Sequence, residues 1–129
     1  MIVDDEIHVN AVVGAKLRGA GFSVLSARDG EEAMNLINQG TPDLVITDWQ
    51  MPRMSGIELS RRLRTDPRTA GIPVIMVTSR GHRIPQSDLD GTNIVAMMAK
   101  PFSPRELLAK AQEILSRHAP SSVHDAEAA

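Results

Sequence analysis

The sequence has 129 residues and a mass of 14.0 kDa, enough for one packed domain and too little for a multidomain enzyme. Its 14 basic and 16 acidic residues give a net charge of -2, which excludes the broad positive field of non-specific nucleic-acid binding, so we expect no direct nucleic-acid partner. Cysteine is absent, and neither a signal segment nor an apolar run of roughly 18 to 20 residues is found, which predicts a cytoplasmic protein without membrane insertion.

Short apolar segments alternate with helical patterns along the chain. Strands are predicted at residues 2–3, 22–25, 44–47, 73–78 and 94–99. Apolar residues recur at helical spacing within residues 9–20, 33–37 and 59–63, and a last helix is predicted over residues 104–117. Several strands are continuously apolar, as is typical of parallel strands covered on both faces. We therefore predict an α/β fold with a doubly wound, five-stranded parallel sheet and helices on both faces.

Two helix starts carry a capping-box pair, in which a serine and a glutamate three residues later satisfy free backbone amides. The pairs are Ser55 with Glu58 and Ser103 with Glu106. We expect a helix to begin directly after each serine.

The connection over residues 79–93 is irregular. It contains Gly81, Pro85 and Gly91 where the alternation requires a fourth helix, and these residue types carry the largest costs in a helix. We therefore expect a short or irregular fourth helix. Residues 118–129 contain Val123 as their only sizeable apolar residue, which predicts a disordered tail or linker after a domain of residues 1–117.

Polar residues follow four of the five predicted strands. The first strand ends in Asp4 and Asp5, the third in Asp48, the fourth in Thr78 and the fifth in Lys100. Ligands of doubly wound sheets bind beyond the carboxyl ends of the strands. Each residue also has a purely structural interpretation, such as a turn at Asp48. Three carboxylates at one edge would repel one another, and a hard divalent cation such as Mg²⁺ would relieve that repulsion.

These residues lie in four motifs: VDDE at residues 3–6, DWQMPRMSG at 48–56, VTS at 77–79 and KPF at 100–102. In their order and spacing the chain resembles the response-regulator receiver domains of bacterial two-component signalling, the CheY-like superfamily, from residue 2 to about residue 117. The resemblance implies a flavodoxin-like strand order of 2-1-3-4-5. It also implies a phosphoprotein that acts as a regulatory phosphoacceptor rather than an enzyme, and that assists its own phosphorylation and dephosphorylation.

The resemblance assigns a role to each site residue. Asp48 would accept the phosphoryl group as an aspartyl phosphate, and Thr78 and Lys100 would contact phosphoryl oxygens. The Mg²⁺ cofactor would be bound by Asp4, Asp5, Asp48 and the backbone carbonyl of Gln50. The phosphoryl donor would be a histidine kinase or a phosphotransfer protein of a phosphorelay, and phosphorylation would switch the binding of an unidentified downstream protein.

Two other functions are weighed against this one. A phosphorylation-independent adaptor with a receiver-like fold would not need all five polar residues of the motifs. A phosphohydrolase with a nucleophilic aspartate generally needs a second acid two residues later, where this chain has Gln50. A stand-alone receiver is favoured over a piece of a longer regulator. The family's usual aromatic switch position holds Met97, which excludes a rotating-ring switch, and Met97 and Met98 are expected to pack in the core.

Overall fold

The computed structural model describes residues 1–79 and 85–118. Its strands are β1 (Ile2–Val3), β2 (Ser26–Ala27), β3 (Val45–Asp48), β4 (Val74–Thr78) and β5 (Ile94–Ala99). They form one parallel sheet in the order β2-β1-β3-β4-β5. The predicted fold class and strand order are therefore confirmed.

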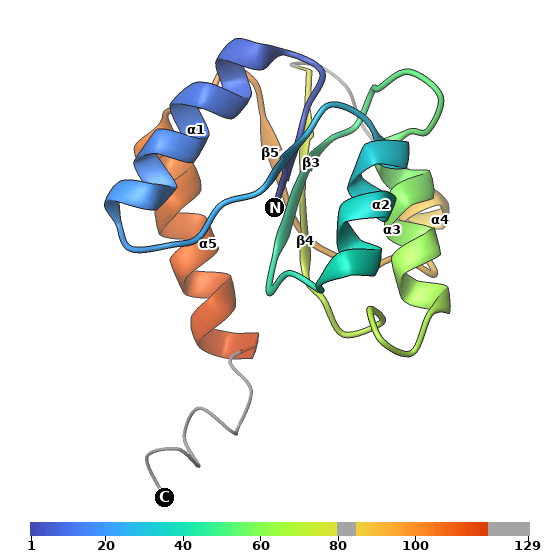
Figure 1. Cartoon of the computed structure of the whole chain (residues 1–129). Helices are drawn as coiled ribbons and strands as arrows, with labels where there is room; N and C mark the ends of the chain where they lie inside the picture. Colours follow the sequence, from blue (N-terminus) through green and yellow to red (C-terminus); the bar gives the residue numbers. More distant parts are fainter. Residues whose placement is uncertain (80–84, 119–129) are drawn as a thin grey trace, which may run out of the picture.

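Helices cover both faces of this sheet (Figure 1). The helices are α1 (Ile7–Gly19), α2 (Gly30–Gln39), α3 (Gly56–Thr65), α4 (Gln86–Leu89) and α5 (Pro104–His118). Helices α1 and α5 lie on one face, and α2, α3 and α4 lie on the other (Figure 1). Successive residues of β1 point to opposite faces, so that Ile2 packs with Leu17 and Ile114 while Val3 packs with Leu59 in a second core cluster.

Both predicted helix starts are confirmed by their hydrogen bonds. The Glu58 amide donates to Ser55 Oγ at 3.1 Å at the start of α3. At the start of α5 the Glu106 amide donates to Ser103 Oγ at 3.0 Å, and the Ser103 amide donates to the Glu106 carboxylate at 3.0 Å. The local sequence therefore determines where these two helices begin.

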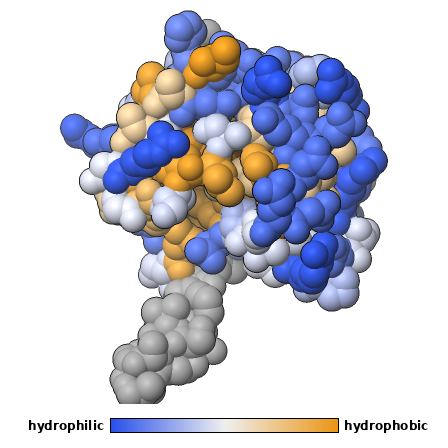
Figure 2. Space-filling model, viewed as in Figure 1, coloured by the Kyte–Doolittle hydropathy of each residue, from blue (hydrophilic) through white to orange (hydrophobic). Residues whose placement is uncertain are grey.

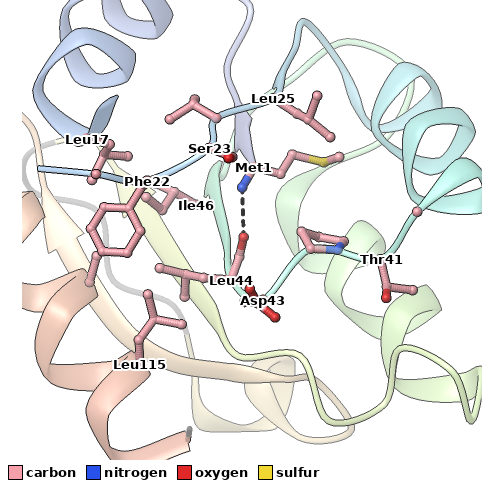
Figure 3. Close-up of a pocket in the computed structure, with 15 residues that line it drawn as sticks. Met1, Leu17, Phe22, Ser23, Leu25, Thr41, Asp43, Leu44, Ile46 and Leu115 are labelled. Atoms are coloured by element: carbon pink, nitrogen blue, oxygen red, sulfur yellow. Dashed lines mark hydrogen bonds between the residues drawn. The ribbon is translucent and has the colours of Figure 1, made fainter. Parts of the chain in front are cut away.

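The prediction for the second strand was wrong in position, because β2 follows residues 22–25 instead of containing them. The Phe22 amide donates to the Leu17 carbonyl at 3.1 Å, so Phe22 belongs to the turn that ends α1. In the register of the sheet, β1 pairs with Ser26 and Ala27. Phe22 instead lines a cavity of about 450 Å³ at the amino end of the strands. Figure 3 shows Phe22 and Leu115 on its wall.

The irregular connection before β5 is confirmed in its described part, where α4 spans only residues 86–89. Strand β5 lies at the edge of the sheet and alternates between partly buried and exposed side chains. Met98 packs against the core, whereas Met97 is 40% exposed, so the core prediction was wrong for Met97.

The predicted tail lies outside the described residues from residue 119 on. Within the described ranges, no helix is long and apolar enough to cross a membrane.

Candidate functional site

The carboxyl ends of four strands bring the predicted site residues to one edge of the sheet, at the top of the view in Figure 1. Asp48 and Thr78 are the last residues of the neighbouring strands β3 and β4. Asp4 follows β1, and Lys100 follows β5. The parallel register therefore assembles residues that are as far as 96 positions apart in the sequence.

Three carboxylates crowd this edge. One oxygen each of Asp4, Asp5 and Asp48 lie within 4.8 Å of one another. Asp4 is only 2% exposed and Asp48 9% exposed, whereas Asp5 is exposed to solvent. The site is thus a partly buried anionic cluster with one open side.

The ammonium group of Lys100 partly neutralises the cluster. Its Nζ lies 3.2 Å from Asp4 Oδ2 and 3.7 Å from Asp48 Oδ1. A third carboxylate, that of Glu6, lies 3.3 Å from the same Nζ. Glu6 was not among the predicted site residues, and nothing in its local sequence indicates a contact with a residue 94 positions away. Lys100 is therefore held among three acids, two of which belong to the predicted metal site.

The crowding changes the charge state of the site. Burial, together with the Asp4 and Asp5 carboxylates, raises the pKa of Asp48 to about 6, although Lys100 opposes the shift. Burial also raises the pKa of Asp4. Burial opposes the change at Lys100, but the Asp4 and Asp48 carboxylates outweigh it and raise the pKa of that ammonium group. The ionised cluster is therefore costly without a further cation.

These donors fit a divalent ion of the Mg²⁺ type. Such an ion prefers oxygen ligands and keeps several waters, so that a few carboxylates on an open side suffice. Burial and, after it, repulsion from Asp4 and Asp5 raise the pKa of Asp48, and a bound cation would offset the cost of ionising this carboxyl. The predicted carboxylate ligands are thus close together in the structure.

Two hydrogen bonds fix the backbone of the loop that follows Asp48. The Trp49 amide donates to the Val77 carbonyl at 2.9 Å, and the Gly56 amide donates to the Trp49 carbonyl at 2.9 Å. Gln50 lies in this loop with an exposed side chain. The loop therefore turns back on the end of β3 before α3 begins.

A backbone hydrogen bond joins Thr78 to Lys100. Thr78 is buried at the end of β4, and its carbonyl accepts a hydrogen bond of 2.7 Å from the Lys100 amide. The structure thus brings Thr78 and Lys100 to the edge of the sheet that carries Asp48.

Comparison with known sequences agrees with this geometry. The family model of the response regulator receiver domain matches residues 1–112. The phosphate regulon transcriptional regulatory protein PhoB of Pseudomonas aeruginosa is 39% identical over 122 residues, which cover 93% of this chain and 52% of that protein. The protein of the same name from Escherichia coli is 34% identical over 125 residues, which cover 97% of this chain and 55% of that protein. The chain therefore spans about half the length of these relatives.

Solved structures give the same result. The chemotaxis response regulator CheY4 of Vibrio cholerae has a TM-score of 0.81 and 30% identity, covering 88% of this chain and 95% of that one. A CheY-like receiver domain protein from Methanospirillum hungatei has a TM-score of 0.79 and 29% identity, covering 92% and 94%. The fold and the acidic edge are those of a regulatory signalling domain. The chain belongs to the response regulator receiver domains of two-component systems.

Proposed function

We propose that this receiver domain accepts a phosphoryl group on Asp48 from the phosphohistidine of a histidine kinase or a phosphotransfer protein. The observation that carries the proposal is the contact of one ammonium group, that of Lys100, with Asp4 and Asp48 at the open acidic edge. Transfer of a phosphoryl group needs positioning and charge neutralisation more than covalent work by the protein, and this edge offers both.

In the transfer, an Asp48 carboxylate oxygen attacks the phosphorus atom in line with the leaving imidazole nitrogen. The new O–P bond forms as the P–N bond breaks, and the electron pair of the broken bond stays on the imidazole. The Lys100 ammonium, which lies 3.7 Å from Asp48 Oδ1, pairs with a phosphoryl oxygen, and the Thr78 hydroxyl donates to another. The product is an acyl phosphate, whose ready hydrolysis suits a reversible signal.

Asp4, Asp5, Asp48 and the Gln50 carbonyl are the residues that would hold Mg²⁺. When bound, the ion would offset the charge that builds up on the phosphoryl oxygens. Asp5 and the open side of the cluster face solvent, so the ion can keep water ligands there.

The proposal is tested with acetyl phosphate, a small phosphoryl donor, in the presence of Mg²⁺ or of EDTA. Intact-mass spectrometry should show one phosphoryl adduct with Mg²⁺ and little or none with EDTA. No adduct under either condition contradicts the phosphoacceptor role. An adduct that EDTA does not reduce contradicts the metal requirement.

The protein donor would approach over an apolar rim beside the site. Ile7 is 70% exposed and Val12 55% exposed on α1, and Figure 2 shows apolar side chains on the surface over this helix. A cavity of about 580 Å³ next to them is lined by Val12, Phe102 and Lys100 among others. Because this cavity is lined by Lys100 and the exposed apolar groups beside it favour a protein contact, we infer that the donor protein covers this rim when its phosphohistidine reaches Asp48.

Polar substitutions on the rim should therefore separate the two kinds of donor. We expect Ile7→Gln and Val12→Gln to slow transfer from a protein donor about tenfold or more, with little change in uptake from acetyl phosphate. The donor is the histidine kinase that phosphorylates the wild type fastest in a panel, followed with radiolabelled phosphate. Val95→Gln is the matched control, because Val95 is 46% exposed on β5, on another element. Equal transfer rates in all three variants would contradict the proposed role of the rim in binding the donor protein.

The downstream step is a change in protein binding. The balanced charge of the chain offers no field for nucleic acid, so we propose that the phosphorylated domain acts on a protein partner in the cytoplasm. The domain is regulatory, and its own residues assist both the gain and the loss of the phosphoryl group.

A further inference from the structure

The side chain of Asn10, in α1, contacts the backbone at the carboxyl end of β1, where the acidic cluster begins. Its Nδ2 donates to the Asp4 carbonyl at 2.9 Å and lies 3.4 Å from the Ala27 carbonyl. Asn10 is 9% exposed, on the face of α1 that also buries Val13 and Leu17. An amide side chain therefore interrupts an apolar helix face at the point where that face meets the strand end.

The hydrogen bond lies at the end of a short strand that pairs with β2 on one side and β3 on the other. Strands β1 and β2 contain two residues each, whereas an average strand contains about five or six. Beyond this short pairing, the Asp4 amide donates to the Ala27 carbonyl at 3.0 Å. Asn10 holds the other polar group of the Asp4 backbone, its carbonyl.

That carbonyl belongs to the peptide unit that joins Asp4 to Asp5. A peptide unit is planar, so fixing its oxygen also fixes the direction in which the chain continues to Asp5. The Asp4 side chain is held separately, because its Oδ1 accepts from the Glu6 amide at 2.9 Å. The placement of Asp5 relative to Asp4 thus depends on the Asn10 amide.

The position has a cost. Asn10 Oδ1 is buried and has no hydrogen-bond partner among the residues that the structure describes, and an unpaired buried acceptor is unfavourable. An apolar residue like its neighbour Val9 would avoid this cost. The presence of asparagine at position 10 is therefore explained by the hydrogen bond that its Nδ2 donates to the Asp4 carbonyl.

We propose that Asn10 is a positioning residue for the metal-binding pair Asp4 and Asp5, acting through the peptide between them. The inference rests on the proposed function, since it takes these carboxylates as Mg²⁺ ligands. Groups that orient metal ligands typically change metal affinity about 10- to 100-fold when they are removed.

The test is the Kd of Mg²⁺, measured by isothermal titration calorimetry on Asn10→Ala and Asn10→Leu. The leucine variant keeps the packed volume but lacks the donor, so it guards against a cavity that unfolds the protein. We expect both variants to bind Mg²⁺ about 10-fold more weakly or worse. Thermal unfolding of each variant checks that it is folded at the temperature of the titration.

Asn93 offers a matched control. It is also buried, its Nδ2 donates to the Thr69 carbonyl at 3.1 Å, and its Oδ1 likewise has no partner among the described residues. It precedes β5, at the opposite end of the sheet from the acidic cluster. Asn93→Ala should lower the Tm, as we also expect of Asn10→Ala, but leave the Kd of Mg²⁺ unchanged.

The outcomes separate the two proposals. If the wild type binds Mg²⁺ and the Asn10 variants bind it with the same Kd, the role of Asn10 is overturned but the metal site is not. Equal weakening by Asn10→Ala and Asn93→Ala overturns it too, because the effect would then follow stability. A wild-type protein that shows no Mg²⁺ binding overturns the metal site itself.

Discussion

Asp48→Asn is expected to take up no phosphoryl group from acetyl phosphate and Mg²⁺, under conditions in which the wild type takes up one. The substitution keeps the size and shape of the side chain and removes the carboxylate that we propose as the nucleophile. Intact-mass spectrometry measures the adduct. Its loss on treatment with hydroxylamine, which cleaves acyl phosphates, identifies the bond in the wild type.

The same variant should be more stable than the wild type when Mg²⁺ is absent. Asp48 has a pKa of about 6 in the folded protein, above the 3.8 of an unperturbed aspartate, so its ionisation above pH 6 opposes folding. The stability that protonated Asp48 contributes is complete below pH 3.8 and is lost as the pH rises through about 6. The Tm advantage of Asp48→Asn in EDTA should therefore be present at pH 7 to 8 and disappear in acid.

Asp43→Asn is the control for both measurements. Asp43 is an exposed aspartate that precedes β3, at the amino end of the same strand. Its variant should take up phosphate as the wild type does. Uptake by Asp48→Asn at the wild-type level would show that another residue is the acceptor and would contradict the proposed chemistry.

Much of the fold follows from signals that are local in the sequence. The serines at positions 55 and 103 accept hydrogen bonds from the predicted glutamate amides, and both helices begin directly after them. The buried strands β3 and β4 were predicted to within one residue at either end, because strands covered on both faces are continuously apolar. Once the sheet was known to be parallel, the meeting of Asp4, Asp48 and Lys100 at one edge followed.

Features that depend on pairing partners were harder to predict. Residues 22–25 are as apolar as a strand, yet the sheet pairs β1 with Ser26 and Ala27 instead. Met97 was expected in the core because it lies in a continuously apolar strand, but β5 is an edge strand in which partly buried and exposed side chains alternate. Tertiary context decides both cases.

The contacts of Glu6 and Asn10 were missed for a different reason. Glu6 approaches Lys100 across 94 positions of sequence, a distance that no spacing rule covers. Asn10 stands in an apolar helical stripe, and a polar residue there signals that a buried partner exists without saying which one. Their partners became visible only with the packing of α1 on the sheet.

The close approach of α3 to the end of β3 leaves no room for a side chain at Gly56. A Cβ at this position would lie 2.4 Å from the Asp48 carbonyl oxygen and 2.9 Å from Met76 Sδ. The methionine side chain can move, but the carbonyl is backbone, and the Thr47 hydroxyl donates to it at 3.0 Å. Relief of the clash must therefore displace either the start of α3 or the backbone of Asp48.

We accordingly expect Gly56→Ala to lower the free energy of unfolding by about 1 to 3 kcal/mol, the usual cost of overpacking. It should also slow uptake from acetyl phosphate in the molecules that remain folded, because the Asp48 backbone shifts. Urea unfolding measures the first effect, and intact-mass kinetics below the unfolding transition measures the second. Gly71→Ala is the control, since a Cβ there meets no atom within 4 Å and should change stability by no more than about 0.5 kcal/mol. If the two alanine variants unfold at the same urea concentration and react at the same rate, the close approach of α3 does not constrain the site.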